Sequence, residues 1–190
     1  MEALLVSTGA VALGEMGDKT QLLALLLAAK FKRPIPIILG IFTATLANHT
    51  LAGAMGAWIA AQLGPQIMRW VVGLGFIAMA GWVLVPDKAN EGAMEEHSRL
   101  GVYGTTVVAF FLAEMGDKTQ IATAALAVHY NSLVAVVTGT TLGMLLADVP
   151  AVLLGDAVAR RVPLRIVRGV AAAIFAGLGL LTLVGVDEFF

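Results

Sequence analysis

The sequence lacks cysteine altogether and contains few charged residues. Its 190 residues include no Cys, and only 13% of them are Asp, Glu, Lys or Arg. The absence of cysteine excludes disulfide scaffolds, thiolate metal sites and thiol redox chemistry, so any metal must be held by oxygen or imidazole. Soluble globular domains are about 25% charged, whereas 59% of this chain is hydrophobic. This composition predicts a protein embedded in a lipid bilayer, and the net charge of −1 gives no reason to expect a nucleic-acid partner.

Six long apolar stretches predict six membrane spans. A spanning helix needs roughly 20 mainly apolar residues. The first stretch has no basic residue before it and is too long for the apolar core of a signal peptide, so we expect it to be a mature span. Charged and helix-breaking residues separate the stretches. The predicted spans are residues 3–29, 35–63, 67–86, 103–128, 133–159 and 165–186, each to within several residues.

Basic residues in the loops and at the adjoining ends of the spans are distributed unevenly. The second and fourth loops and their flanks hold only Arg69. The first, third and fifth loops and their flanks hold Lys30, Lys32, Arg33, Lys88, Arg99, Arg160, Arg161, Arg165 and Arg168. The positive-inside rule therefore places the odd-numbered loops in the cytoplasm and both termini on the non-cytoplasmic side of the cell (inner) membrane. We assign an anchoring role at helix ends to all of these basic residues.

The sequence also contains an internal repeat. Residues 15–21 and residues 114–120 both read Glu-Met-Gly-Asp-Lys-Thr-Gln, and the same offset of 99 residues aligns Gly40 with Gly139. Arg69 and Arg168 also align, so the duplication extends well beyond the motif.

The duplication predicts the domain organisation. We expect a single membrane domain over residues 1–190, with repeat one at about 3–86, a loop at about 87–102 and repeat two at about 103–186. Each repeat has an odd number of spans, so the second repeat must enter the membrane from the opposite side. The predicted fold is an all-α integral membrane protein with six transmembrane helices arranged as two inverted three-helix repeats, an architecture typical of secondary transporters.

The shared motif places ionisable side chains near the middle of a span, where they are costly to bury. Acidic residues three positions apart project from one face of a continuous helix, and a glutamine follows one turn later. Carboxylate and amide oxygens are hard ligands that suit calcium, magnesium or manganese. The predicted metal ligands are Glu15, Asp18, Gln21, Glu114, Asp117 and Gln120.

The remaining motif residues have supporting roles. Thr20 and Thr119 offer hydroxyls, although position 20 of a continuous helix lies well round from position 15. Glycines at positions 17 and 116 would permit close helix approach or local unwinding.

The lysines suggest both a structural alternative and a mechanism. We expect Lys19 to pair with Glu15, and Lys118 with Glu114, as i,i+4 salt bridges that fix helix packing. These pairs would not explain the aspartates. Four motif carboxylates and two lysines leave a charge of −2 when all are ionised, which one divalent cation or two protons would neutralise. The charge balance therefore favours competition between a metal ion and protons.

Three polar residues in the second spans are further candidates. Asn48 and His49 lie in repeat one, and the 99-residue offset aligns Asp148 with His49. A buried histidine more often packs in the interior than binds an ion, whereas Asp148 lies deeper in an apolar run. We include all three as supporting residues of the site.

The doubled motif E-x-G-D-[KR]-[ST], at residues 15–20 and 114–119, resembles the Gdt family of membrane proteins. That family includes bacterial manganese exporters and Golgi manganese and calcium transporters. The similarity covers nearly the whole chain and implies cation/proton exchange, with manganese or calcium as substrate and the motif acids as ligands. Spacing alone predicts a hard-cation site, and the identity of the metal comes from the resemblance.

We therefore predict a secondary transporter that exchanges a divalent cation for protons and exports the cation from the cytoplasm. We expect no enzymatic activity and no prosthetic group, and the partners are membrane lipid, the cation and protons. A cation channel is one alternative, because acidic rings also select cations. A small-solute exporter is another, since fold does not fix function. A membrane-embedded hydrolase is less favoured, because it would not need two inverted copies of its catalytic residues.

Overall fold

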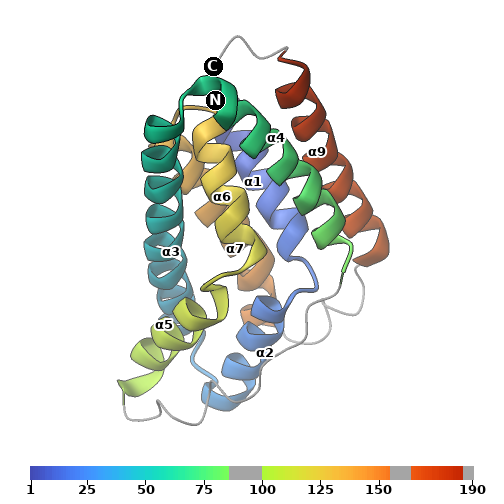
Figure 1. The fold of residues 1–190 in the computed structure, drawn as a ribbon. Helices are drawn as coiled ribbons and strands as arrows, with labels where there is room; N and C mark the ends of the chain where they lie inside the picture. The colour runs from blue at the N-terminus through green and yellow to red at the C-terminus, as the bar shows by residue number, and fades with distance from the viewer. Residues whose placement is uncertain (86–99, 155–163, 186–190) are drawn as a thin grey trace.

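The computed structural model describes residues 1–85, 100–154 and 164–185, and these residues form eight α-helices. Figure 1 shows them as a bundle in which α4 and α9 lie side by side along one flank. The helices are α1 (Glu2–Glu15), α2 (Lys19–Phe31), α3 (Pro34–Leu63), α4 (Pro65–Val83), α5 (Gly101–Glu114), α6 (Lys118–His129), α7 (Leu133–Leu154) and α9 (Leu164–Val184).

Two of the predicted spans are broken helices. The expected helix over 3–29 is α1 followed by α2, and the expected helix over 103–128 is α5 followed by α6. Each break contains a glycine with positive φ, 77° at Gly17 and 75° at Gly116, which glycine adopts without strain. An aspartate in an extended conformation then precedes the next helix. The prediction of continuous helices through the motifs was therefore wrong, and the unwinding that the glycines permit is present.

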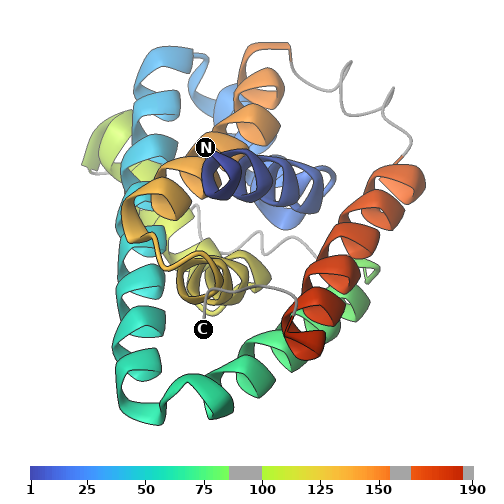
Figure 2. The same ribbon diagram turned by 90° about the horizontal axis from the view of Figure 1, so that it is seen from above.

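The helices repeat with the same offset as the sequence. α1, α2, α3 and α4 begin at residues 2, 19, 34 and 65, and α5, α6, α7 and α9 begin 99 residues later, at 101, 118, 133 and 164. The packing is reciprocal, because α1 lies against α7 and α5 lies against α3. The first helix of each half therefore packs on the long helix of the other half, and Figure 2 shows α1 and α7 together in the middle of the bundle.

Glycines allow this close packing. A Cβ atom added at Gly139 of α7 would lie 2.6 Å from the Leu4 carbonyl oxygen of α1. A Cβ atom at the equivalent Gly40 of α3 would lie 2.6 Å from Thr106 Cβ of α5. Small residues at helix contacts let backbones approach closely inside a membrane, so the aligned glycines explain why both pairs are tight.

The outer surface is that of an integral membrane protein. Helices α3, α4, α7 and most of α9 are long and apolar enough to cross a bilayer, and large apolar side chains such as Met55 and Trp58 are exposed on the outside. The two broken spans are divided into shorter pieces, of which α5 is a 14-residue apolar helix.

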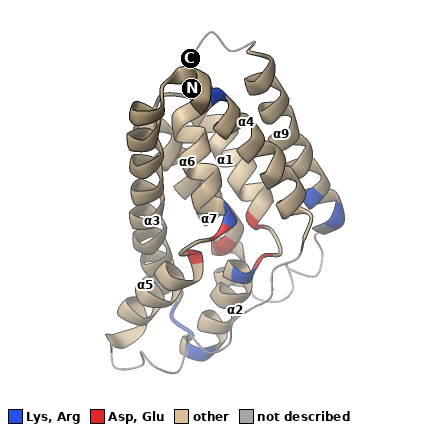
Figure 3. Cartoon of the chain, in the orientation of Figure 1, with Lys and Arg blue, Asp and Glu red and all other residues tan. Residues whose placement is uncertain are grey.

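Charged residues lie at several helix ends and also near the two breaks inside the bundle. In Figure 1, the end of α2 lies at the bottom of the bundle, the beginning of α4 lies at the top, and α9 begins on the flank at a height between them. In Figure 3, Lys and Arg residues lie near the end of α2, at the beginnings of α4 and α9, and beside the acids at the two breaks, whereas the visible Asp and Glu residues lie near the breaks, about halfway along the bundle. The interior acids are thus separated from both ends by apolar helix.

Candidate metal centre

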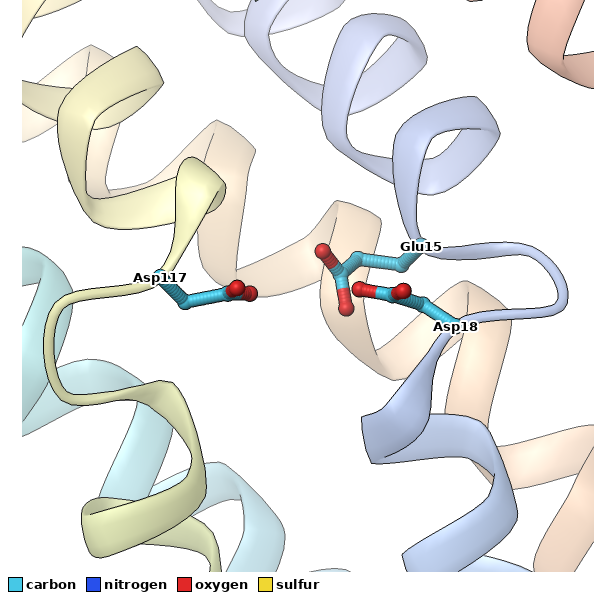
Figure 4. A group of neighbouring side chains, drawn as sticks. All are labelled: Glu15, Asp18 and Asp117. Atoms are coloured by element: carbon cyan, nitrogen blue, oxygen red, sulfur yellow. The ribbon is translucent and has the colours of Figure 1, made fainter. Parts of the chain in front are cut away.

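Three carboxylates converge where the two breaks face each other. Glu15 is the last residue of α1, and Asp18 and Asp117 directly precede α2 and α6. One oxygen from each of the three lies within 4.8 Å of the others, and all three residues are buried. Figure 4 shows Glu15 and Asp18 pointing from the first break toward Asp117 of the second. Both halves of the chain therefore contribute to one cluster.

The spacing of these oxygens suits a hard divalent cation. Calcium binds oxygens at about 2.3–2.6 Å, so two oxygens on opposite sides of the ion lie about 4.6–5.2 Å apart, and closer when they are neighbours in its shell. The three oxygens lie within 4.8 Å of one another, which is compatible with one shared ion. Backbone carbonyls in a break can add further oxygen ligands, as in the discontinuous helices of transporters.

Glu114, the fourth predicted carboxylate, lies outside the cluster in this conformation. Its Oε1 accepts a 2.7 Å hydrogen bond from Thr45, and its Oε2 accepts a 3.3 Å bond from Asn48. Its equivalent Glu15 accepts a 2.6 Å bond from Thr20, and Glu15 Oε1 has no hydrogen-bond partner among the described residues. The two halves thus hold equivalent glutamates differently.

The lysines form ion pairs across the bundle, so the predicted pairs within each motif were wrong. Lys19 Nζ lies 3.0 Å from Asp117 Oδ1, and Lys118 Nζ lies 2.9 Å from Asp18 Oδ1. The break after Glu15 removes the helical i,i+4 geometry and points each lysine at the opposite motif. A cation entering the cluster therefore competes with an ammonium group for each aspartate.

The predicted glutamine ligands brace the breaks. The Gly17 N–H donates to Gln21 Oε1 over 2.9 Å, and Gln21 Nε2 donates to the Ala147 carbonyl over 2.9 Å. In the other half, the Gly116 N–H donates to Gln120 Oε1 over 2.9 Å, and Gln120 Nε2 donates to Asn48 Oδ1 over 3.1 Å. Each side-chain amide satisfies a backbone N–H released by the break and ties it to the long helix of the other half.

The supporting residues divide into two groups. Thr20 and Asn48 bond motif glutamates, and Thr119 makes a long 3.4 Å contact with Asp117 Oδ2. The broken helix brings Thr20 to Glu15, which a continuous helix would not do. His49 and Asp148 are fully buried, and neither side chain has a hydrogen-bond partner among the described residues.

The sequence did not reveal two contributors. Thr45 donates to Glu114, although a threonine in an apolar span more often bonds its own helix backbone. Arg168 has the sequence context of an anchoring residue, yet its Nη2 donates a 2.9 Å hydrogen bond to the Gly17 carbonyl in the first break. Its alignment with Arg69 was the available signal for this role.

Comparison with known proteins adds four findings. Residues 3–91 and 102–188 match the family described as "Divalent cation/proton antiporter GDT1". The chain is 50% identical over 183 residues to a Vibrio cholerae protein named "Putative manganese exporter", covering 96% of this chain and 90% of that protein. It is 26% identical over 202 residues to "GDT1-like protein 3" of Oryza sativa subsp. indica, covering 93% and 71% of the two chains. No solved structure matches the chain significantly.

Proposed function

The chain belongs to the GDT1 divalent cation/proton antiporter family, and we propose that it exchanges manganese for protons at the Glu15, Asp18 and Asp117 cluster and exports the metal from the cytoplasm. It is a divalent cation transporter, as its family and its relatives indicate. The observation that carries the site assignment is the convergence of carboxylates from both halves within 4.8 Å.

The ion pairs support a competitive mechanism. Lys19 and Lys118 occupy the aspartates in this conformation, so a metal ion must displace ammonium groups as well as protons. With Glu114 included, four carboxylates and two lysines leave a charge of −2. A bound divalent ion or two protons would each make the site neutral. A neutral site is less costly inside an apolar bundle than an empty site with a charge of −2, so the site should alternate between these two loaded states.

The architecture that we propose is six spans in two inverted repeats. The constant offset of 99 residues between equivalent helices and the reciprocal packing of α1 on α7 and of α5 on α3 support it. In such transporters the site lies between the repeats, and rocking of one repeat against the other exposes it alternately to each side. The end of the bundle that holds the basic end of α2 faces the cytoplasm of the cell membrane in this proposal, with both termini on the opposite side.

Proton flux in vesicles tests this function. Purified protein is reconstituted into sealed vesicles containing a pH-sensitive dye, and manganese, calcium or magnesium is added outside. We expect manganese-driven proton movement against the flow of metal, calcium-driven movement at a lower rate, and neither in protein-free vesicles. Metal flux that is insensitive to an imposed pH gradient would instead indicate a channel, and absence of any metal flux would refute the proposal.

A further inference from the structure

The two motif breaks are alike in sequence but differ in how the rest of the chain covers them. Gly17 is half-buried, and its carbonyl oxygen accepts the hydrogen bond from Arg168 of α9. Gly116 is exposed. Among the described residues, α9 packs against α1, whereas α4 has no comparable packing against α5. An arginine from the last span of the other repeat is therefore bound to the first break in this conformation.

Arg69 is the counterpart of Arg168. Each arginine is the fifth residue of its helix, α4 or α9, and the two are 99 residues apart. Arg69 Nε is buried and has no hydrogen-bond partner among the described residues. A Cβ atom added at Gly185 would lie 2.9 Å from Arg69 Nη1, so the guanidinium rests against the end of α9. A buried donor without an acceptor is costly and calls for an explanation.

Resting on the proposed exchange mechanism, we propose that Arg168 and Arg69 are alternating positioning residues of the transport cycle. In the conformation described, Arg168 binds the Gly17 carbonyl. In the opposite conformation, Arg69 donates to the Gly116 carbonyl and Arg168 releases Gly17. α4 and α9 run in opposite directions along one flank (Figure 1), so Arg69 and Arg168, each the fifth residue of its helix, lie toward opposite ends of this helix pair.

The physical basis is the symmetry of the repeats. When two repeats of equivalent fold adopt different conformations, exchanging those conformations generates the other state of the transporter. The Gly17 carbonyl lies where the helix has unwound, so it needs a donor from elsewhere. A charged donor is stronger than a neutral one, and losing one such bond changes the ratio of two states by roughly tenfold to a hundredfold.

Distance measurements between spin labels test the alternation, and the cysteine-free chain allows labels at chosen sites. Pair one reports the distance between α2 and α9, and pair two reports the distance between α6 and α4. All four labelled positions are exposed and the pairs are equivalent under the 99-residue offset: Leu22 with Ile166, and Ile121 with Ile67.

We expect Arg168→Gln to lengthen pair one and shorten pair two, with a shift in population of about tenfold or more. Arg69→Gln should shift both pairs in the opposite direction, which also tests the proposal if Arg168→Gln does not fold. Arg165→Gln is the matched control, because Arg165 is exposed in the first turn of the same helix, and it should change neither distance.

A purely structural role predicts a different pattern. If Arg168→Gln lengthens pair one and leaves pair two unchanged, or if both variants shift the pairs in the same direction, the alternation is refuted. Metal-driven proton flux is measured in parallel and should slow in both variants. If wild-type vesicles show no exchange while the distances shift in opposite directions, the exchange proposal fails and the arginine alternation stands. Exchange with unchanged distances refutes the alternation alone.

Discussion

Lys19 and Lys118 each reach the aspartate of the opposite motif, so the two halves are joined by charge at the point where the helices are broken. Lys118 and Asp18 are both almost completely buried. A buried ion pair stabilises little relative to apolar residues of similar size, because desolvation offsets the attraction. Stability alone therefore does not account for these pairs, and under the proposed function they hold the aspartates in place for a cation.

The first residue-scale prediction separates the transport role of Asp18 from its packing role. Asp18→Asn leaves the buried ammonium of Lys118 without its carboxylate, which should destabilise the protein by about 3–5 kcal/mol. The double variant Asp18→Asn with Lys118→Met removes both charges and should recover most of that stability. Metal-driven proton exchange should be lost in both variants, because a negatively charged ligand that also binds a proton is missing.

Thermal unfolding in detergent and dye-reported proton flux in vesicles measure the two effects separately. Glu2→Gln is the control, since it removes an exposed carboxylate at the start of α1. A stable double variant that exchanges manganese at the wild-type rate would show that Asp18 serves packing only. The double variant makes the result decisive even when the single variant folds poorly.

At the scale of elements, the breaks determine what could be predicted from the sequence. Apolar length predicted α3, α4, α7 and α9 to within a few residues at their starts, because lipid leaves the backbone no other partner than its own helix. The same reasoning predicted continuous helices through the motifs, and there it was wrong. Helix geometry assigned Lys19 to Glu15, and only the unwound backbone points Lys19 toward Asp117.

The residue types of the site were predictable, but their partners were not. Three of the four predicted carboxylates do converge. The hydrogen bonds of Glu114 with Thr45 and Asn48 depend on how α5 packs against α3. Contacts between helices that are distant in the chain leave no periodic signal in a single sequence, so these bonds required the packed structure.

Packing at the aligned glycines leads to an element-scale prediction. Gly139→Ala places a Cβ atom 2.6 Å from the Leu4 carbonyl oxygen, so α7 and α1 must move apart. We expect a loss of about 1–3 kcal/mol in stability. Gly9→Ala makes the same substitution inside α1, where nothing lies within 4 Å of the added atom, and it should stabilise the helix by about 0.5–1 kcal/mol.

Unfolding of the two alanine variants in detergent, compared with the wild type, checks this prediction. The two substitutions share the same change in helix propensity, so their difference isolates the packing between α1 and α7. Equal effects at both positions would mean that the two helices can separate freely. In that case the close contact would contribute nothing to holding the two halves together.

At the scale of the whole molecule, equivalent helices of the two halves run in opposite directions along the bundle. The beginning of α3 lies near the end of α2, whereas the beginning of α7 lies near the end of α6 at the other end (Figure 1). Ile35 and Val134 are equivalent residues at these two positions, and both are exposed. If the repeats are inverted in the membrane, these two residues face different compartments although their local structures match.

Cysteine labelling in intact cells tests the inversion directly, because the chain has no background thiol. Val134→Cys should react with an impermeant thiol reagent added outside, and Ile35→Cys should react only after the cells are opened. Gln62→Cys, at the far end of α3 from Ile35, is the internal control and should react from outside. The positive-inside rule fixes this direction, since the basic end of α2 should face the cytoplasm.

The reverse labelling pattern at all three positions would still support inverted repeats, but it would mean that the protein has the opposite orientation in the membrane, with both termini in the cytoplasm. Labelling of Ile35→Cys and Val134→Cys from the same side would contradict inverted repeats, and the rocking mechanism would then lose its structural basis.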